Sequence, residues 1–206
     1  MKKNTFILLA VFILLGNRAI CQGSYLLDED FDSYTVGTFP SSWVLQYPGY
    51  GSDLQVVTNS EFVSGTSSLK LEGKSNNSAN AEFMLTTKPD MVWLEVNVKI
   101  TYEGTTFMKN YPHALVGFNN NYRSSFSNGY ACVSFLESGS IVAAGTTLQS
   151  YNPNQWYKVK IKYNVPMSTM DVWIDDVQKG ANIAFTANTS KYNAVLLHGG
   201  NAGHSI

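Results

Sequence analysis

The chain has 206 residues and a formal net charge of −1, with 14% charged and 13% aromatic residues. This length suits a single all-β domain, and the near-neutral charge argues against a nucleic-acid partner or an anionic membrane surface. Residues that favour strands and turns are abundant, whereas the residues that build helices are scarce.

The first 21 residues are predicted to be a signal peptide. Lys2 and Lys3 precede ten apolar residues, Phe6 to Leu15, whereas a membrane-spanning helix needs about 20. Small residues near Cys21 predict cleavage close to Gln22. The alternative, a lipid anchor on Cys21, is disfavoured because Arg18 stands where a lipobox has a leucine-like residue. We therefore expect a secreted or cell-surface protein without a transmembrane segment, with one domain over residues 22–206.

Short stretches of alternating apolar and polar residues follow one another along the remaining chain. Alternation with period two predicts strands, and no window of the sequence has a helical period. The expected strands lie in residues 26–34, 38–47, 54–58, 67–73, 81–87, 91–102, 113–119, 130–137, 140–145 and 193–199, with a hairpin at 156–180. Many short strands and no helices predict an antiparallel sandwich or barrel.

The hairpin, WYKVKIKYNVPMSTMDVWIDDVQKG, has one apolar face and one charged face. Matching the apolar faces of its two strands predicts the pairs Lys162 with Asp171 and Lys158 with Asp175, and sets Lys160 against the ring of Trp173. Neighbours within the sheet therefore explain the three lysines, and we expect this charged face to be a solvated ladder rather than a ligand site.

Three segments of the sequence, DEDFDSYTVGTFPSSWVLQ, SGTSSLKLEG and NQWYKVKIKYN…MDVWIDDV, resemble the concanavalin A-like lectin/glucanase superfamily, especially its laminin G-like bacterial members. The resemblance implies a two-sheet antiparallel jelly-roll sandwich of about a dozen strands. Similar chains close with a strand like Y-F-D-D-I-x-V. The sequence stops at NAGHSI, so we expect the last strand to be missing, an unpaired edge, and room for further domains beyond Ile206.

Members of that superfamily bind sugars, mediate adhesion, or hydrolyse and cleave polysaccharides. Its retaining glycosidases carry two carboxylates on one strand, about 5 to 5.5 Å apart. The nearest local match, WLEVNVKI, has Glu95 in the first position, but Asn97 and Lys99 follow it. We therefore expect no catalytic pair here and a solvent-facing Glu95.

A calcium site is more plausible in this sequence than a catalytic pair of carboxylates. Asp28, Asp30 and Asp32 alternate, so an extended segment would place them on one face as hard oxygen ligands. Similar jelly rolls often hold a structural calcium ion between the opening and closing strands. Asp30 and Asp32 are the predicted ligands of this ion, and plain solvated carboxylates without a metal are the alternative.

Three loops combine exposed aromatic rings with amide, carboxylate or basic groups, the chemistry that binds a sugar ring and its hydroxyls. Turn chemistry alone is the alternative explanation for each loop. The candidate ligand-binding residues are Tyr47, Tyr50, Asp53, Tyr111, His113, Asn120, Tyr122, Arg123 and Phe126.

Trp43, Trp156 and the single mature cysteine, Cys132, lie inside strand patterns and are predicted to be core residues. Trp93 shares a face with Glu95. It either covers a second layer, the interpretation that we favour, or lies open on the sheet.

The sequence as a whole predicts a secreted, non-catalytic module that binds a glycan or polysaccharide or acts in adhesion. Two alternatives stay open. One is a glycoside hydrolase or lyase of the same fold, and the other is a structural spacer of a larger surface protein.

Overall fold

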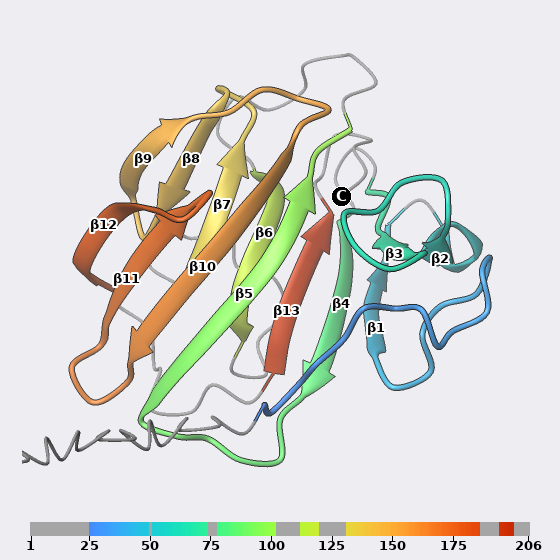
Figure 1. Cartoon of the computed structure of the whole chain (residues 1–206), viewed down its shortest axis with the longest axis horizontal. Helices are drawn as coiled ribbons and strands as arrows, with labels where there is room; N and C mark the ends of the chain where they lie inside the picture. The colour runs from blue at the N-terminus through green and yellow to red at the C-terminus, as the bar shows by residue number, and fades with distance from the viewer. Residues whose placement is uncertain are drawn as a thin grey trace, which may run out of the picture.

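The computed structural model of the chain describes residues 25–49, 51–73, 78–101, 112–119, 131–185 and 194–199. Within these ranges the strands form two large antiparallel sheets packed face to face (Figure 1). The larger sheet consists, in spatial order, of β1 (Val44–Pro48), β4 (Ala79–Met84), β13 (Ala194–Gly199), β6 (Pro112–Asn119), β7 (Cys132–Leu136), β8 (Ser140–Ala143) and β9 (Thr146–Ser150).

The smaller sheet has four strands, whose order is β12 (Val177–Ala184), β11 (Thr169–Ile174), β10 (Trp156–Asn164) and β5 (Met91–Lys99). A third, two-stranded sheet pairs β2 (Val56–Thr58) with β3 (Ser68–Lys70) at one side of the sandwich. A single 3-10 turn, η1 (Ser52–Leu54), lies between β1 and β2. The predicted fold class, an all-β antiparallel jelly-roll sandwich of two sheets, is confirmed.

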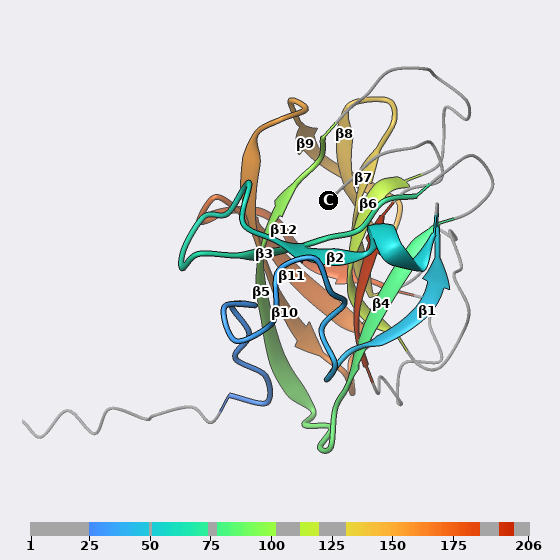
Figure 2. The same ribbon diagram turned by 90° about the vertical axis from the view of Figure 1, so that its right-hand side faces the viewer.

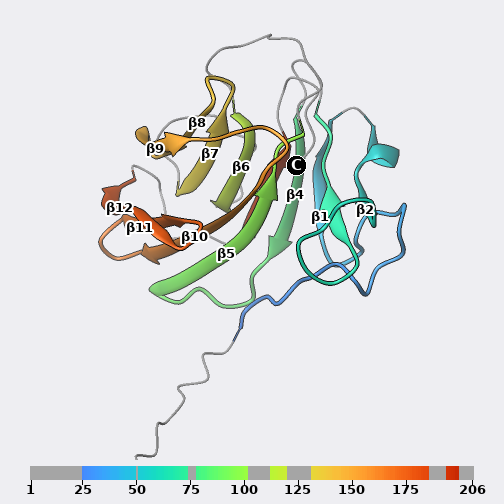
Figure 3. The ribbon, with the colours of Figure 1, turned by 45° about the horizontal axis from the view of Figure 1, so that its top comes forward.

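The core fills the space between the two large sheets, which Figures 2 and 3 show as two layers. Alternate residues of β10 are buried along its whole length, as the period of two requires. Tyr163 of β10 meets Phe118 of the opposite sheet edge to face, with ring centroids 4.7 Å apart. Trp43 is buried in the same core, as the sequence predicts.

Most of the predicted strands are present, but the first one is wrong. Residues 26–34 form no strand and turn sharply at Phe31, whose φ is +64°. The reason is local, because acidic side chains in this segment accept hydrogen bonds from the backbone and compete with strand pairing. The Glu29 carboxylate accepts one from the Phe31 N–H, and Asp30 accepts one from the Asp32 N–H. The sequence analysis also missed β9 and β12.

The predicted register of the hairpin is confirmed. Lys162 lies opposite Asp171 and Lys160 lies opposite Trp173, while the backbone of Lys158 exchanges hydrogen bonds with Asp175. Asp175 and Asp176 both have positive φ, so they form the two-residue turn that matches the twist of a hairpin between β11 and β12. The D-D motif is therefore a turn signal.

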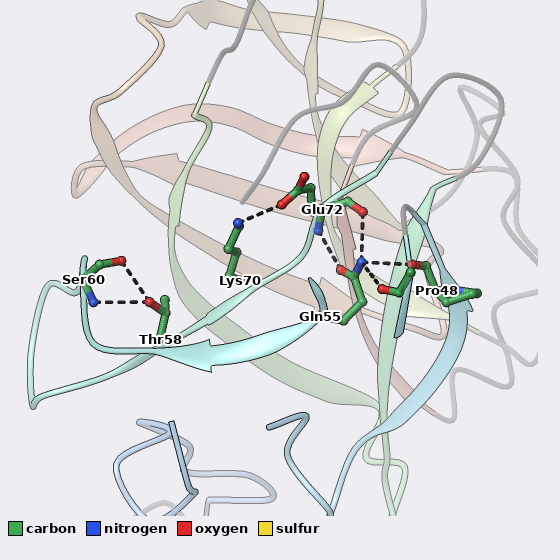
Figure 4. A network of polar contacts seen from close by, with 7 residues as sticks. Pro48, Gln55, Thr58, Ser60, Lys70 and Glu72 are labelled. Carbon is green, nitrogen blue, oxygen red and sulfur yellow. Dashed lines mark hydrogen bonds and ion pairs between the residues drawn. The ribbon is translucent and has the colours of Figure 1, made fainter. Parts of the chain in front are cut away.

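A buried glutamine joins three segments beside this sandwich (Figure 4). The side chain of Gln55 is fully buried, and its Nε2 atom lies 2.9–3.0 Å from the carbonyl oxygens of Pro48, Gly51 and Glu72. Its Oε1 atom accepts a hydrogen bond of 2.6 Å from the Glu72 N–H. Gln55 thus fixes the end of β1 and the segment after β3 to each other.

We expect the Gln55→Ala substitution to lower the free energy of unfolding by about 2–4 kcal/mol, because it leaves several buried backbone groups without a partner. Chemical denaturation followed by circular dichroism measures this loss. The matched control is Gln178→Ala on exposed β12, which should change stability by less than about 0.5 kcal/mol. Equal effects of the two substitutions would show that the Gln55 network contributes nothing.

Candidate functional site

Two tryptophans lie together on the outer face of the four-stranded sheet, the face turned away from the core. Trp93 of β5 and Trp173 of β11 have ring centroids 5.3 Å apart with a tilt of 33°. Trp93 is 55% exposed. The two rings meet across β10, where Lys162 lies opposite Trp93 and Lys160 lies opposite Trp173. We refer to these two rings and their charged neighbours Glu95, Lys160 and Lys162 as the Trp93/Trp173 face.

The charged groups of this face pair within the sheet. The Lys160 ammonium lies 2.9 Å from a Glu95 carboxylate oxygen and 3.6 Å from Asp176, and the hydrogen bond to Glu95 raises the pKa of Lys160. Lys158 pairs with Asp176 at 2.5 Å and lowers the pKa of that carboxyl. Lys158 and Lys160 therefore have partners within the sheet, as predicted.

The partners within the ladder differ from those predicted. Lys160 binds Glu95 on β5 instead of stacking on Trp173, because an anion directly across the ladder attracts an ammonium more strongly than a ring does. The cation–π contact instead joins the Lys162 ammonium to the Trp93 ring, at 5.8 Å from its centroid.

The favoured interpretation of Trp93 as the cover of a second layer is also wrong, because its ring lies open on the outer face. Glu95 is exposed on the same face, as the sequence predicts. Trp156 is only half-buried, which corrects its prediction as a core residue.

The candidate sugar-binding loops are only partly described. Tyr47 is half-buried at the end of β1, and Asp53 is exposed in η1; the Gln55 network lies directly beneath this loop. His113, the second residue of β6, is 4% exposed, and its Nδ1 atom lies 2.9 Å from the Tyr151 hydroxyl. Tyr50, Tyr111, Asn120, Tyr122, Arg123 and Phe126 lie outside the described residues, so the loops stay a prediction.

The predicted calcium ligands both accept hydrogen bonds from the backbone. An Asp30 oxygen accepts one from the Asp32 N–H at 2.9 Å, and both Asp32 oxygens accept from the Thr66 N–H, at 2.8 and 3.1 Å. Because Phe31 interrupts the extended conformation, the expected single face of alternating aspartates is not formed. No group of three or more potential metal-binding side chains occurs in the described part of the chain.

The outer face of the seven-stranded sheet carries buried polar groups that the sequence analysis missed. Asn80 and Glu82 of β4 are 1% and 4% exposed, although their neighbours Ala79 and Ala81 face the core. A Glu82 oxygen accepts a hydrogen bond of 3.1 Å from the Gln46 side chain. The signal was available, because the alternation in β4 places both polar residues on one face.

No protein-family model matches the sequence, and no curated protein matches it. Among solved structures, a chain described as a sialidase has a TM-score of 0.54 and 13% identity, over 76% of this chain and 13% of that one. Arcelin-5, a lectin-like defense protein from Phaseolus vulgaris, has a TM-score of 0.47 and 11% identity, over 82% of this chain and 91% of that one.

The exoplasmic/lumenal domain of VIP36 in its metal-free form has a TM-score of 0.35 and 13% identity, over 83% of this chain and 86% of that one. At these identities the similarity concerns the fold alone, and the chain corresponds to only 13% of the sialidase. The structure and the sialidase comparison together define an antiparallel β-sandwich. In the described ranges, no helix has the length and apolar character needed to cross a membrane.

Cys132 is buried on the outer face of the seven-stranded sheet, against Leu115 and apart from the main core. Its thiol contacts the Phe118 carbonyl oxygen at 3.8 Å, and burial raises its pKa to about 12. The thiolate, which is the nucleophilic form, is therefore scarce at any pH below that value.

We expect iodoacetamide at pH 8 to alkylate Cys132 at least about a hundredfold more slowly in the folded chain than in guanidinium, because the folded thiol is buried and protonated. Peptide mass spectrometry separates Cys132 from Cys21. Because folding raises the pKa of Cys132, the contribution of this thiol to folding stability should be constant below the unfolded thiol's pKa, about 8.5, and should fall as the pH rises from there to about 12. Rapid labelling of the folded chain would contradict the burial.

Proposed function

We propose that the protein is a secreted, non-catalytic module that binds carbohydrate, of the laminin G-like kind within the concanavalin A-like lectins, and serves in glycan recognition or adhesion. The observation that carries the proposal is the Trp93/Trp173 face. Two tryptophan rings lie side by side on a sheet surface, and one of them is open to solvent over half of its area.

The chemistry of this face suits a sugar. A tryptophan ring offers a large apolar surface on which the C–H face of a pyranose stacks, whereas charged groups at its border bind the hydroxyls. Glu95 and Lys160 supply an acceptor and a donor directly beside the rings, and Asn97 of β5 adds an exposed amide. The ladder therefore has a second use, because its ion pairs hold these polar groups in place around the rings.

Hydrolysis is the weaker alternative. A retaining glycosidase needs two carboxyl groups about 5 to 5.5 Å apart. Glu95 is paired with a lysine, and Asn97 and Lys99 follow it on the same face of β5. Measurement of reducing ends released from the same polysaccharides is the test of this alternative.

Calcium enters the proposal only as a structural ion. Calcium takes six to eight oxygen ligands, and Asp30 and Asp32 supply two carboxylates that already cap backbone N–H groups. No part of the binding chemistry on the Trp93/Trp173 face passes through a metal. Binding measured with calcium and with a chelator should therefore be the same on this face.

The test is a glycan array, followed by affinity electrophoresis in soluble β-glucan, xylan and mannan. We expect Trp93→Ala and Trp173→Ala each to weaken binding by about tenfold, because one stacked ring contributes about 0.5–1.5 kcal/mol beyond the area that it buries. Tyr25→Ala, at a site that is 81% exposed, is the matched control and should leave binding unchanged.

Two outcomes would contradict the proposal. Binding that survives both tryptophan substitutions but is lost with Tyr50→Ala, Tyr111→Ala or Tyr122→Ala would move the site to the predicted loops. A folded protein that binds no glycan would refute the function and favour a structural spacer. Circular dichroism of each variant separates loss of binding from loss of folding.

A further inference from the structure

The four-stranded sheet ends at β5 with an open edge. All nine residues of β5 pair with β10 on one side, and among the described residues no strand pairs on the other side. The N-terminal segment, drawn in blue in Figure 1, lies on this side of β5 without a described backbone hydrogen bond to it, and its residues Glu29 and Asp30 line the cleft between them. Alternate residues of such an edge direct both N–H and C=O groups outward, where another strand can bind them.

The other edges of the two large sheets are irregular. At the β12 edge, the neighbouring strand β11 has register shifts at Met170–Val172 and Val172–Trp173. At the β1 edge a shift lies between Leu45 and Tyr47. At the β9 edge a shift lies in the neighbouring strand β8, between Ile141 and Val142. Bulges of this kind discourage pairing with another chain. The ladder of β5 with β10 has no shift along its length. Of the described edges of the two large sheets, β5 is thus the one suited to accept a strand.

A cleft of about 180 Å³ opens beside this edge and reaches between the two sheets. Its floor is apolar and includes Val96 of β5 together with Val116 and Leu197 of the opposite sheet. Val96 faces the core but is only half-buried, whereas Val92 and Val98 on the same face of β5 are buried. The cleft therefore has room for an apolar side chain from a strand placed beside β5.

The rim of the cleft is acidic. Glu29, Asp30 and Glu95 line it, and no lysine or arginine lies among the described lining residues. Glu95 pairs with Lys160, whereas Glu29 and Asp30 accept hydrogen bonds but have no ion pair among the described residues. An occupant with basic side chains complements this rim, and an acidic one is repelled.

We propose that the open edge of β5 and its cleft bind an extended segment of a partner protein, in which apolar side chains alternate with lysine or arginine, as a fifth strand of this sheet. The apolar side chains enter the cleft over Val96, and the basic side chains lie on the outer side near Glu95. Backbone hydrogen bonds to β5 provide the affinity, and the alternation provides the specificity. This inference does not rest on the glycan-binding proposal.

A second copy of the chain is a poorer occupant. Two β5 strands paired about a two-fold axis near their centres bring the Glu95 side chains of the two copies close together, and like charges across a ladder are destabilising. The acidic rims of the two clefts also approach each other in that arrangement. A partner of opposite charge meets neither obstacle.

The test uses the full chain and a fluorescent nonapeptide of alternating lysine and valine, KVKVKVKVK, with blocked ends. A peptide of the same composition without alternation, KKVVKKVVK, controls for charge alone. We expect the alternating peptide to bind at least about tenfold more tightly by fluorescence anisotropy, because several cross-strand pairs each contribute about 0.2–1 kcal/mol. Hydrogen exchange should show new protection of amides in residues 91–99.

Two charge variants sharpen the test. Glu95→Gln should weaken binding of the alternating peptide by about two- to fivefold, whereas Asp53→Asn, which removes an exposed carboxylate of η1 that does not line the cleft, should leave binding unchanged. Equal binding of the two peptides, or protection of β12 in place of β5, would overturn the proposal. A dimer whose β5 amides are protected before any peptide is added would overturn the choice of a partner protein.

Discussion

Two nine-residue strands, β5 and β10, pair along their full length, and the arrangement of the smaller sheet depends on this ladder. Because side chains alternate across a strand, an unbroken register places every second residue in the core and the others on the outer face. A shift by one residue would bury Lys160 and expose Ile161. Because Val159, Ile161 and Tyr163 are buried, the residues between them must face outward. The same register therefore determines which groups surround Trp93 on the outer face.

The hairpin formed by β10 and β11 shows how far local sequence reasoning reaches. Its register follows from the alternation of apolar residues along both strands and from the short loop between them. The predicted position of Lys162 opposite Asp171 is therefore correct. The partner of Lys160 was not predictable in the same way. Glu95 is distant in the sequence and reaches Lys160 only because β5 pairs with β10 on its free side, a choice of neighbour that alternation does not specify.

The acidic segment at residues 28–32 shows a different limit. Its alternating aspartates have the pattern of a strand, but Glu29 and Asp30 bind backbone N–H groups within two residues and turn the chain at Phe31. This competition depends on local hydrogen bonds and does not change the alternation of residue types in the sequence.

For Trp93 the alternation predicts the correct face of the sheet. Whether that face is covered depends on tertiary packing, which the sequence pattern does not contain.

The two surfaces assigned to β5 are adjacent, and this adjacency has a thermodynamic consequence. A strand added to the open edge would extend the outer face of the sheet and bring its basic side chains next to Glu95, which now pairs with Lys160. Competition for Glu95 would leave Asp176 as the remaining partner of Lys160 and change the donors that a sugar meets beside the tryptophan rings. Binding at the edge and binding on the Trp93/Trp173 face would then be linked, and each ligand would alter the affinity of the other by the same factor. The ion pair between Glu95 and Lys160 is the element through which the two sites would communicate.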